Sequence, residues 1–361
     1  MNEKKNILIC PLEWGLGHAG RMVPLAKRLQ QLNHNIIFGS GEEHLNFFRN
    51  EVPGASYIYF PGFRISYSKV LPQYFIILFK SPVLFYHILL EHFRLKKIIR
   101  DSSIDIVISD SRIGLWNSGI KTVFITHQMR IQFPKPFGFL EFIGIQIIRS
   151  VIKKYSYCFI PDLSGDLNVS GRLSHGFRLP ENVRYVGILS RFCGQNTDYS
   201  SGSEKCTVIL SGPEPQRSIL KQKLIKILIL PGKPVIMLEG KPGMTYESYR
   251  IKNIEFCNHL SEIDTIKLLK ESETIITRSG YTTIMELISL GLTALLIPTP
   301  GQTEQEYLAK SLSEKRWFRS IAQKDLNENI QIPLKRAIIP SGIMEKSAKL
   351  LEIALAELLE Q

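Results

Sequence analysis

Cysteine is scarce in this sequence of 361 residues, and its five cysteines show no CxxC spacing. An odd and unpatterned count argues against a disulfide framework and a structural zinc site, and it is typical of proteins in a reducing compartment. Residues 1–5 are too few and too polar to form a signal peptide before the apolar run at residues 7–10. We therefore expect a cytoplasmic protein.

The sequence also lacks low-complexity tracts, internal repeats and an Asp-x-Asp motif that could hold a divalent ion. Its length allows two domains, and 44% hydrophobic with 22% charged residues is typical of a folded protein. Residues 1–190 hold 23 Lys and Arg against 13 Asp and Glu, whereas residues 191–361 hold 22 against 20. A basic first half predicts an anionic partner, either nucleic acid or a membrane surface.

Apolar runs of strand length alternate with amphipathic stretches of helix length in both halves of the chain. One series ends near residue 187, and a second begins at residues 207–210. Residues 191–205 lack hydrophobic periodicity and are the predicted linker. The pattern predicts an α/β protein with two doubly wound, Rossmann-like domains facing across a cleft, at 1–190 and 206–340, and a C-terminal helix at 341–361.

A glycine-rich segment follows the first predicted strand, with Gly15, Gly17 and Gly20 in the spacing G-x-G-x-x-G. Four residues precede Gly15 and no acid ends the next strand, so the segment is a poor nicotinamide site. We expect an open, substrate-contacting loop before a helix at residues 22–32. His18 in this loop is the candidate base, because an imidazole titrates near neutral pH.

Polar residues follow two further predicted strands of the first half. Asp110 comes after residues 104–109, and His127 comes after residues 121–125. Ligands of open parallel sheets bind beyond the carboxyl ends of strands, so both are candidate substrate contacts. A structural role is the alternative for each, and it is favoured for Asp110.

The second half has a pattern that suits a nucleotide at residues 277–286, where Ser279 and Gly280 lie between a predicted strand and helix. A helix N-terminus favours a phosphate, and Glu286 one turn later suits the hydroxyls of a ribose. The next loop carries Gln302, Gln305 and Glu306, which suit the hydroxyls of a sugar. Ordinary capped helices are the alternative at both places.

Residues 71–100 are crowded with aromatic and aliphatic side chains and end in several Lys and Arg. Lys80 and Pro82 are expected to break this stretch into pieces too short to span a membrane. It is either a segment that lies on an anionic membrane surface or one or two buried helices. A second apolar cluster at residues 133–140 favours the membrane.

These motifs resemble those of GT-B glycosyltransferases with a family 28-type C-terminal domain, and most closely a less characterised bacterial branch. The family's Ser-Gly-x-x-Thr-x-x-Glu pattern matches Ser279, Gly280, Thr283 and Glu286. The family's glycine-rich loop matches Gly15, Gly17 and His18, and with Asp110 and His127 from their strand ends, Gly15 and Gly17 are the predicted acceptor contacts. The resemblance implies donor contacts at Arg191, Ser211, Gly212, Ser279, Gly280, Thr283, Glu286, Gln305 and Glu306. Neighbouring residues complete the predicted donor site, namely Arg217, Arg278, Thr282 and Gln302.

The resemblance implies transfer of a sugar from a nucleotide sugar, such as UDP-GlcNAc or another UDP-hexose, to a hydroxyl of a membrane-associated or cell-envelope acceptor. It also implies inversion, no metal and no cofactor, with His18 as base. Alternatives are a UDP-sugar epimerase, a nicotinamide-dependent oxidoreductase, and a non-catalytic protein that binds nucleotide or membrane. No RNA-binding aromatic motif or helix-turn-helix signal supports nucleic acid as partner.

Overall fold

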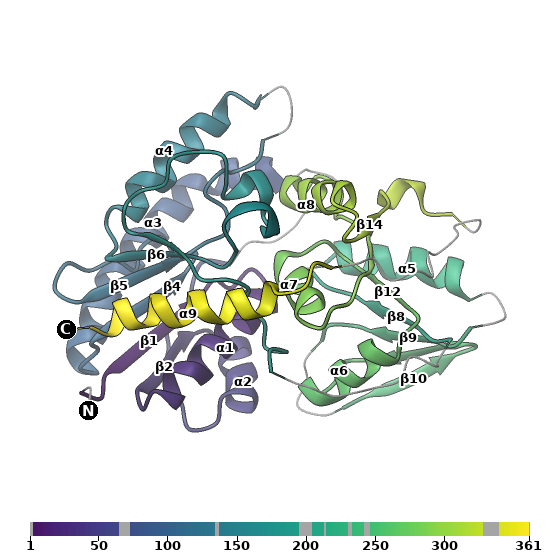
Figure 1. Ribbon diagram of the computed structural model, residues 1–361, viewed down its shortest axis with the longest axis horizontal. Helices are drawn as coiled ribbons and strands as arrows, with labels where there is room; N and C mark the ends of the chain where they lie inside the picture. The colour runs from purple at the N-terminus through teal and green to yellow at the C-terminus, as the bar shows by residue number, and fades with distance from the viewer. Residues whose placement is uncertain are drawn as a thin grey trace. The chain divides into compact units, whose positions relative to one another are not determined.

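The computed structural model describes residues 3–64, 73–133, 137–194, 204–212, 214–229, 233–241, 246–327 and 339–360. The chain forms two compact units (Figure 1). Met1–Ile65, Ile77–Arg191 and Ser341–Gln361 form the first unit, and Phe192–Pro340 forms most of the second. Residues 195–203 of the predicted linker and residues 134–136 of the second apolar cluster lie outside the described residues.

Within the described residues, the first unit holds a parallel sheet in the order β3-β2-β1-β4-β5-β6-β7. Pro11 pairs with Asp110, and Asp110 pairs with Ile125, so the carboxyl ends of β1, β4 and β5 lie side by side. The chain order reverses between β1 and β4, which is where such sheets bind ligands. The strands are β1 (Asn6–Pro11), β2 (Asn35–Ser40), β3 (Ser56–Tyr59), β4 (Ile106–Asp110), β5 (Lys121–Ile125), β6 (Tyr157–Ile160) and β7 (Val183–Tyr185).

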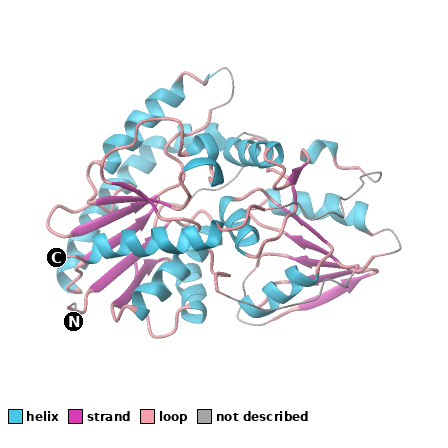
Figure 2. Cartoon of the chain, in the orientation of Figure 1, coloured by secondary structure: helices cyan, strands magenta, loops and turns pink. Residues whose placement is uncertain are grey.

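Helices cover both faces of this sheet (Figure 2). They are α1 (Leu16–Gln31), α2 (Glu42–Glu51), α3 (Gln73–Asp101), α4 (Leu140–Ile152) and α9 (Ile343–Leu359). Successive side chains of a strand point to opposite faces, and β1 is apolar on both. Ile7 and Ile9 join a core with residues of α1, α2 and α9, whereas Leu8 and Cys10 join a core with Leu95 of α3. The continuous apolar run in β1 therefore specifies a central strand.

The second unit has a sheet of its own in the order β10-β11-β9-β8-β12-β13-β14, in which β10 runs antiparallel to β11. Its chain order reverses between β8 and β12. The strands are β8 (Cys206–Ile209), β9 (Val235–Leu238), β10 (Ser248–Ile251), β11 (Ile254–Cys257), β12 (Thr274–Thr277), β13 (Leu295–Leu296) and β14 (Arg319–Ser320). The helices are α5 (Gln216–Leu228), α6 (Glu262–Glu271), α7 (Tyr281–Ser289) and α8 (Thr303–Glu314). The two doubly wound units agree with the predicted fold class.

The first helix differs from its prediction, because α1 begins at Leu16 and not at residue 22. Ala19, Met22 and Val23 are completely buried against the sheet, and this packing outweighs the weak helix propensity of the glycines and of Pro24. His18 consequently lies in the first turn of a helix and not in an open loop.

The predicted break in residues 71–100 is also wrong, because α3 continues from Gln73 to Asp101 through Pro82. Buried residues Glu91, His92 and Leu95 anchor its inner face. Among the residues that the structure describes, no helix is both long and apolar enough to cross a bilayer.

Candidate functional site

The loop between β1 and α1 is fixed by Glu13, which is almost completely buried. Its carboxylate accepts hydrogen bonds from Gly41 N (2.6 Å), Gly62 N (2.9 Å) and Arg64 Nε (2.9 Å). Burial alone would raise the pKa of Glu13, but the bonds from Gly62, Arg64 and Gly41 outweigh it and lower the pKa. Glu13 therefore ties the start of α1 to the ends of β2 and β3.

Gly15 supplies the turn into α1. Its φ of +135° is a conformation that only glycine adopts without strain, and a Cβ at this position would meet no described atom within 4 Å. Gly17 is exposed in the first turn of the same helix. The N-terminus of α1 thus presents an open surface beside His18, and the substrate contacts of Gly15 and Gly17 stay predictions.

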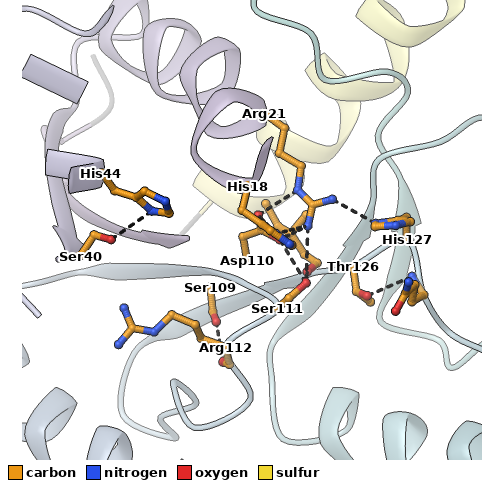
Figure 3. A network of polar contacts seen from close by, with 12 residues as sticks. His18, Arg21, Ser40, His44, Ser109, Asp110, Ser111, Arg112, Thr126 and His127 are labelled. Carbon is orange, nitrogen blue, oxygen red and sulfur yellow. Dashed lines mark hydrogen bonds and ion pairs between the residues drawn. The ribbon is translucent and has the colours of Figure 1, made fainter. Parts of the chain in front are cut away.

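His18 and Asp110 form a hydrogen-bonded pair (Figure 3), with 3.0 Å between His18 Nδ1 and Asp110 Oδ2. The side chain of His18 is 22% exposed, whereas Asp110 is completely buried. Burial alone would raise the pKa of Asp110, but the Arg21 guanidinium and His18 outweigh it and hold that pKa well below its usual range. An ionised, immobile carboxylate therefore orients a partly exposed imidazole.

Arg21 lies one helical turn after His18 and is also buried. Its Nε donates to Asp110 Oδ2 (2.8 Å), its second terminal nitrogen donates to Asp110 Oδ1, and Ser111 Oγ donates to the same oxygen. The second terminal nitrogen also lies 3.0 Å from His18 Nδ1. Arg21 and His18 thus meet at one carboxylate.

The proton on His18 decides what this imidazole can do. With the proton on Nδ1, His18 donates to Asp110, and Nε2 keeps a lone pair that can accept a proton. With the proton on Nε2, Nδ1 accepts from Arg21 instead, and Nε2 can no longer accept a proton from a substrate. Within the part of the chain that the structure describes, Nε2 has no hydrogen bond. The first tautomer is the one suited to general base catalysis.

His127 completes the cluster after β5. The other terminal nitrogen of Arg21 lies 3.0 Å from His127 Nδ1. His44 on α2 lies beside Ser40, and burial lowers the pKa of His44 to about 4. Both rings are almost completely buried, so His18 is the accessible histidine of the three.

Two predictions for the first unit are thereby refined. Asp110 has no exposed surface and is bonded to His18, which agrees with the structural role favoured from sequence, and its contact with an acceptor stays a prediction. His127 is 6% exposed and bonded to Arg21, and its contact with an acceptor stays a prediction.

In the second unit, Gly280 precedes α7 at the carboxyl end of β12. A Cβ at Gly280 would meet no described atom within 4 Å, and its φ is −71°. Thr282, Thr283 and Glu286 follow on α7, each partly exposed. The N-terminus of α7 therefore has room for a ligand and points its N–H groups and positive dipole end toward it, as an anion site requires.

Arg278 and Ser279 are both completely buried, and their contacts with a donor stay predictions. The Arg278 guanidinium donates to Gln216 O (2.9 Å), Ile297 O (3.2 Å) and Pro298 O (3.1 Å). Ser279 Oγ donates to the main-chain oxygen of Gln305 (2.8 Å). Burial lowers the pKa of Arg278 to about 10. Both side chains hold neighbouring loops together.

The loop before α8 is stabilised by two of the side chains predicted to bind a sugar. Gln305 Oε1 accepts from Thr299 N, and Glu306 Oε1 accepts from Gly301 N, each at 2.9 Å. Gln302 Oε1 is buried and has no hydrogen-bond partner among the described residues. The three residues lie together at the start of α8, and their contact with a sugar stays a prediction.

The loop after β8 also contains predicted donor residues. Gly212 has a φ of +93° and an open surface where a Cβ would be, and Ser211 beside it is partly exposed. Arg217 is held by Glu214 (3.0 Å) and by Gly240 O (2.7 Å).

Arg191 ends the first unit, where its guanidinium lies 3.8 Å from Glu51. Its predicted contact with a donor is not tested by this geometry.

Sequence reasoning missed Arg21 and Glu13. The spacing between His18 and Arg21 could have revealed Arg21, because residues three apart share a face of a helix. Glu13 gave no such signal, since its partners at residues 40–64 are distant in sequence.

Comparisons with known proteins agree with this arrangement. Residues 214–351 match the glycosyltransferase family 28 C-terminal domain. The chain is 25% identical over 355 residues to an uncharacterised glycosyltransferase of Methanosarcina acetivorans, covering 93% of this chain and 90% of that protein.

Two further similarities concern part of the sequence and the fold. Over 84 residues, 22% of this chain and 23% of the other, it is 37% identical to the UDP-N-acetylglucosamine–N-acetylmuramyl-(pentapeptide) pyrophosphoryl-undecaprenol N-acetylglucosamine transferase of Exiguobacterium sibiricum. The solved glycotransferase of kitacinnamycin superposes with a TM-score of 0.62 at 14% identity, covering 98% of this chain and 96% of that one. The comparisons therefore support a glycosyltransferase with the GT-B fold, in which residues 214–351 match the family 28 C-terminal domain.

Proposed function

We propose that this protein transfers a hexose from a UDP-sugar to a hydroxyl of a lipid-linked or cell-envelope acceptor. The observation that carries the proposal is the pairing of buried Asp110 with partly exposed His18 at the switch point of the first sheet. A base held in this way can deprotonate a hydroxyl near neutral pH.

The proposed reaction is a single displacement. His18 Nε2 takes the proton of the acceptor hydroxyl, whose oxygen forms a bond to the anomeric carbon of the sugar. The bond from that carbon to the diphosphate oxygen breaks, and the nucleoside diphosphate leaves with the electron pair. One displacement inverts the anomeric centre. Helix N-terminal N–H groups can stabilise the departing charge without a metal ion.

The second unit is proposed to hold the donor. The open N-terminus of α7 at Gly280 suits the diphosphate, and Glu286 suits the ribose hydroxyls. Gln305 and Glu306 are proposed sugar contacts. The local similarity to an enzyme named for UDP-N-acetylglucosamine supports a UDP-sugar as donor.

An anionic membrane surface is the proposed site of action, on the inner face of the plasma membrane. Phe79, Phe85 and Phe93 of α3 are 74%, 63% and 65% exposed. Helical spacing places them on one face with Val83, Tyr86 and Leu89, and exposed Lys and Arg follow at residues 94–100. A second exposed apolar stripe occurs on α4 at Phe142, Ile143 and Ile147. Aromatic surface beside basic residues suits the headgroup region.

The proposal is tested by incubating the protein with UDP-GlcNAc or another UDP-hexose and a detergent extract of bacterial envelope lipids. UDP release should require both sugar donor and lipid extract, and the product should carry the inverted anomeric configuration. Conversion of the sugar nucleotide without lipid extract, and without UDP release, would instead identify an epimerase.

A further inference from the structure

We infer that Arg21 is a positioning residue for sugar transfer, because its guanidinium holds the carboxylate that orients His18 and fixes where the proton of His127 lies. The inference rests on the proposed role of His18 as base. Arg21 contacts the imidazoles of His18 and His127 and the Asp110 carboxylate (Figure 3), so groups from α1, from the loop after β5 and from the end of β4 share one cation.

The tautomer of His127 follows from its bond with Arg21. A guanidinium has only donors and stays charged. The second terminal nitrogen of Arg21 donates to Asp110 Oδ1, whereas the other one has His127 Nδ1 as its acceptor, 3.0 Å away. Nδ1 of His127 is therefore unprotonated, and its ring proton is on Nε2. Arg21 thus makes His127 a neutral ring that can only donate from Nε2.

The charge of Arg21 also acts on His18. Arg21 on its own helix and Asp110 at the end of β4 contact His18, and His44 on α2 interacts with it electrostatically. Arg21 neutralises the Asp110 carboxylate by a bidentate ion pair. It therefore balances the negative charge that an unpaired carboxylate would present to His18.

Two kinds of readout separate this role from simple support of the fold. The first is the ring nitrogen-15 NMR signals of His127 in histidine-labelled protein without substrate, assigned with His127→Gln. The second is the pH dependence of kcat/KM for UDP release. Arg21→Met removes the positive charge. Arg21→Lys keeps the charge but loses the pair of nitrogens that binds both oxygens of Asp110.

Wild type should show His127 protonated at Nε2 alone. Arg21→Met should show a mixture of tautomers, and its acidic limb of kcat/KM should move up by about one pH unit. Arg21→Lys should keep the limb at the wild-type pH but lower kcat. Because Arg21→Met leaves Asp110 with one fewer partner, Arg21→Met/Asp110→Asn serves as a second, uncharged variant for the NMR measurement.

The inference would be overturned if His127 kept its wild-type tautomer in both Arg21→Met and Arg21→Met/Asp110→Asn. It would also be overturned if kcat/KM of Arg21→Met fell at the same acidic pH as kcat/KM of the wild type. A wild type that releases no UDP would refute the proposed function instead. The nitrogen signals are read without substrate, so they still report on the proton positions.

Discussion

His18 Nδ1 lies 3.0 Å from Asp110 Oδ2, although 92 positions separate the two residues in the chain. The contact exists because β1 and β4 are neighbours in the sheet and Pro11 pairs with Asp110. The helix that follows β1 then carries His18 back over the end of β4. Strand order therefore assembles the pair on which the proposed chemistry depends.

Replacement of His18 by Ala should abolish most turnover, because general base catalysis contributes about 10²–10⁴-fold to rate. UDP should still bind with nearly wild-type affinity, since the proposed donor residues belong to the second unit. UDP release and calorimetric titration with UDP measure the two effects. His87→Gln on α3 is the matched control and should retain activity. Turnover that survives in His18→Ala would remove the role of His18.

Asp110→Asn should change how stability depends on pH. The pKa of Asp110 is held below its usual range, so its contribution is complete above about pH 4, the ordinary value, and disappears as pH falls further. The variant should be about 3–5 kcal/mol less stable at neutral pH, because Arg21 loses its buried partner. Denaturant melts across pH should show this gap narrowing below about pH 4. If the unfolding free energies of the wild type and Asp110→Asn differed by the same amount at every pH, the buried ion pair would be contradicted.

The central strands could be predicted from sequence because buried parallel strands are continuous apolar runs. The runs at residues 7–10, 121–125 and 235–238 coincide with β1, β5 and β9. The predicted helix boundaries were wrong where tertiary packing outweighed local helix propensity. Burial of Ala19 and Met22 extends α1 across a glycine-rich stretch, and the buried inner face of α3 continues past Pro82.

The candidate site was predicted in part. His18, Gly15 and Gly280 were identified from their positions after strands, and each lies at an accessible point. The burial of Arg278 and Asp110 could not be read from sequence, since it depends on which loops meet at the sheet edge. A charged residue in a motif can hold the motif's backbone as readily as it can contact a ligand.

Gly280→Ser should weaken nucleotide binding without destabilising the protein. The φ of Gly280 suits any residue, a Cβ there has room, and serine is a good N-cap for α7. The hydroxyl would occupy the N–H groups proposed for phosphate and cost about tenfold in affinity, equivalent to about 1.4 kcal/mol. Calorimetric titration with UDP and thermal melts measure both quantities. Unchanged affinity would place the phosphate elsewhere.

Replacing Phe79, Phe85 and Phe93 by Ser should abolish binding to vesicles that contain anionic lipid. Each inserted Phe contributes about 1.5–3 kcal/mol, so partitioning should fall at least about 100-fold. Folding should be unaffected, because all three side chains are exposed. Ile353→Ser on α9, another exposed apolar residue, is the control. Vesicle sedimentation at two salt concentrations is the measurement. Equal binding by all variants would contradict the proposed membrane surface.

The use of a UDP-sugar is the central claim, and thermal stability with nucleotides tests it most directly. Wild type and Glu286→Ala are melted with UDP, UDP-GlcNAc, GDP, TDP and NAD. A ligand at about 100 times its Kd adds about 2.7 kcal/mol of stability. The account predicts a clear rise in Tm with the UDP compounds that Glu286→Ala removes. A rise with NAD alone, or none with any nucleotide, would contradict it.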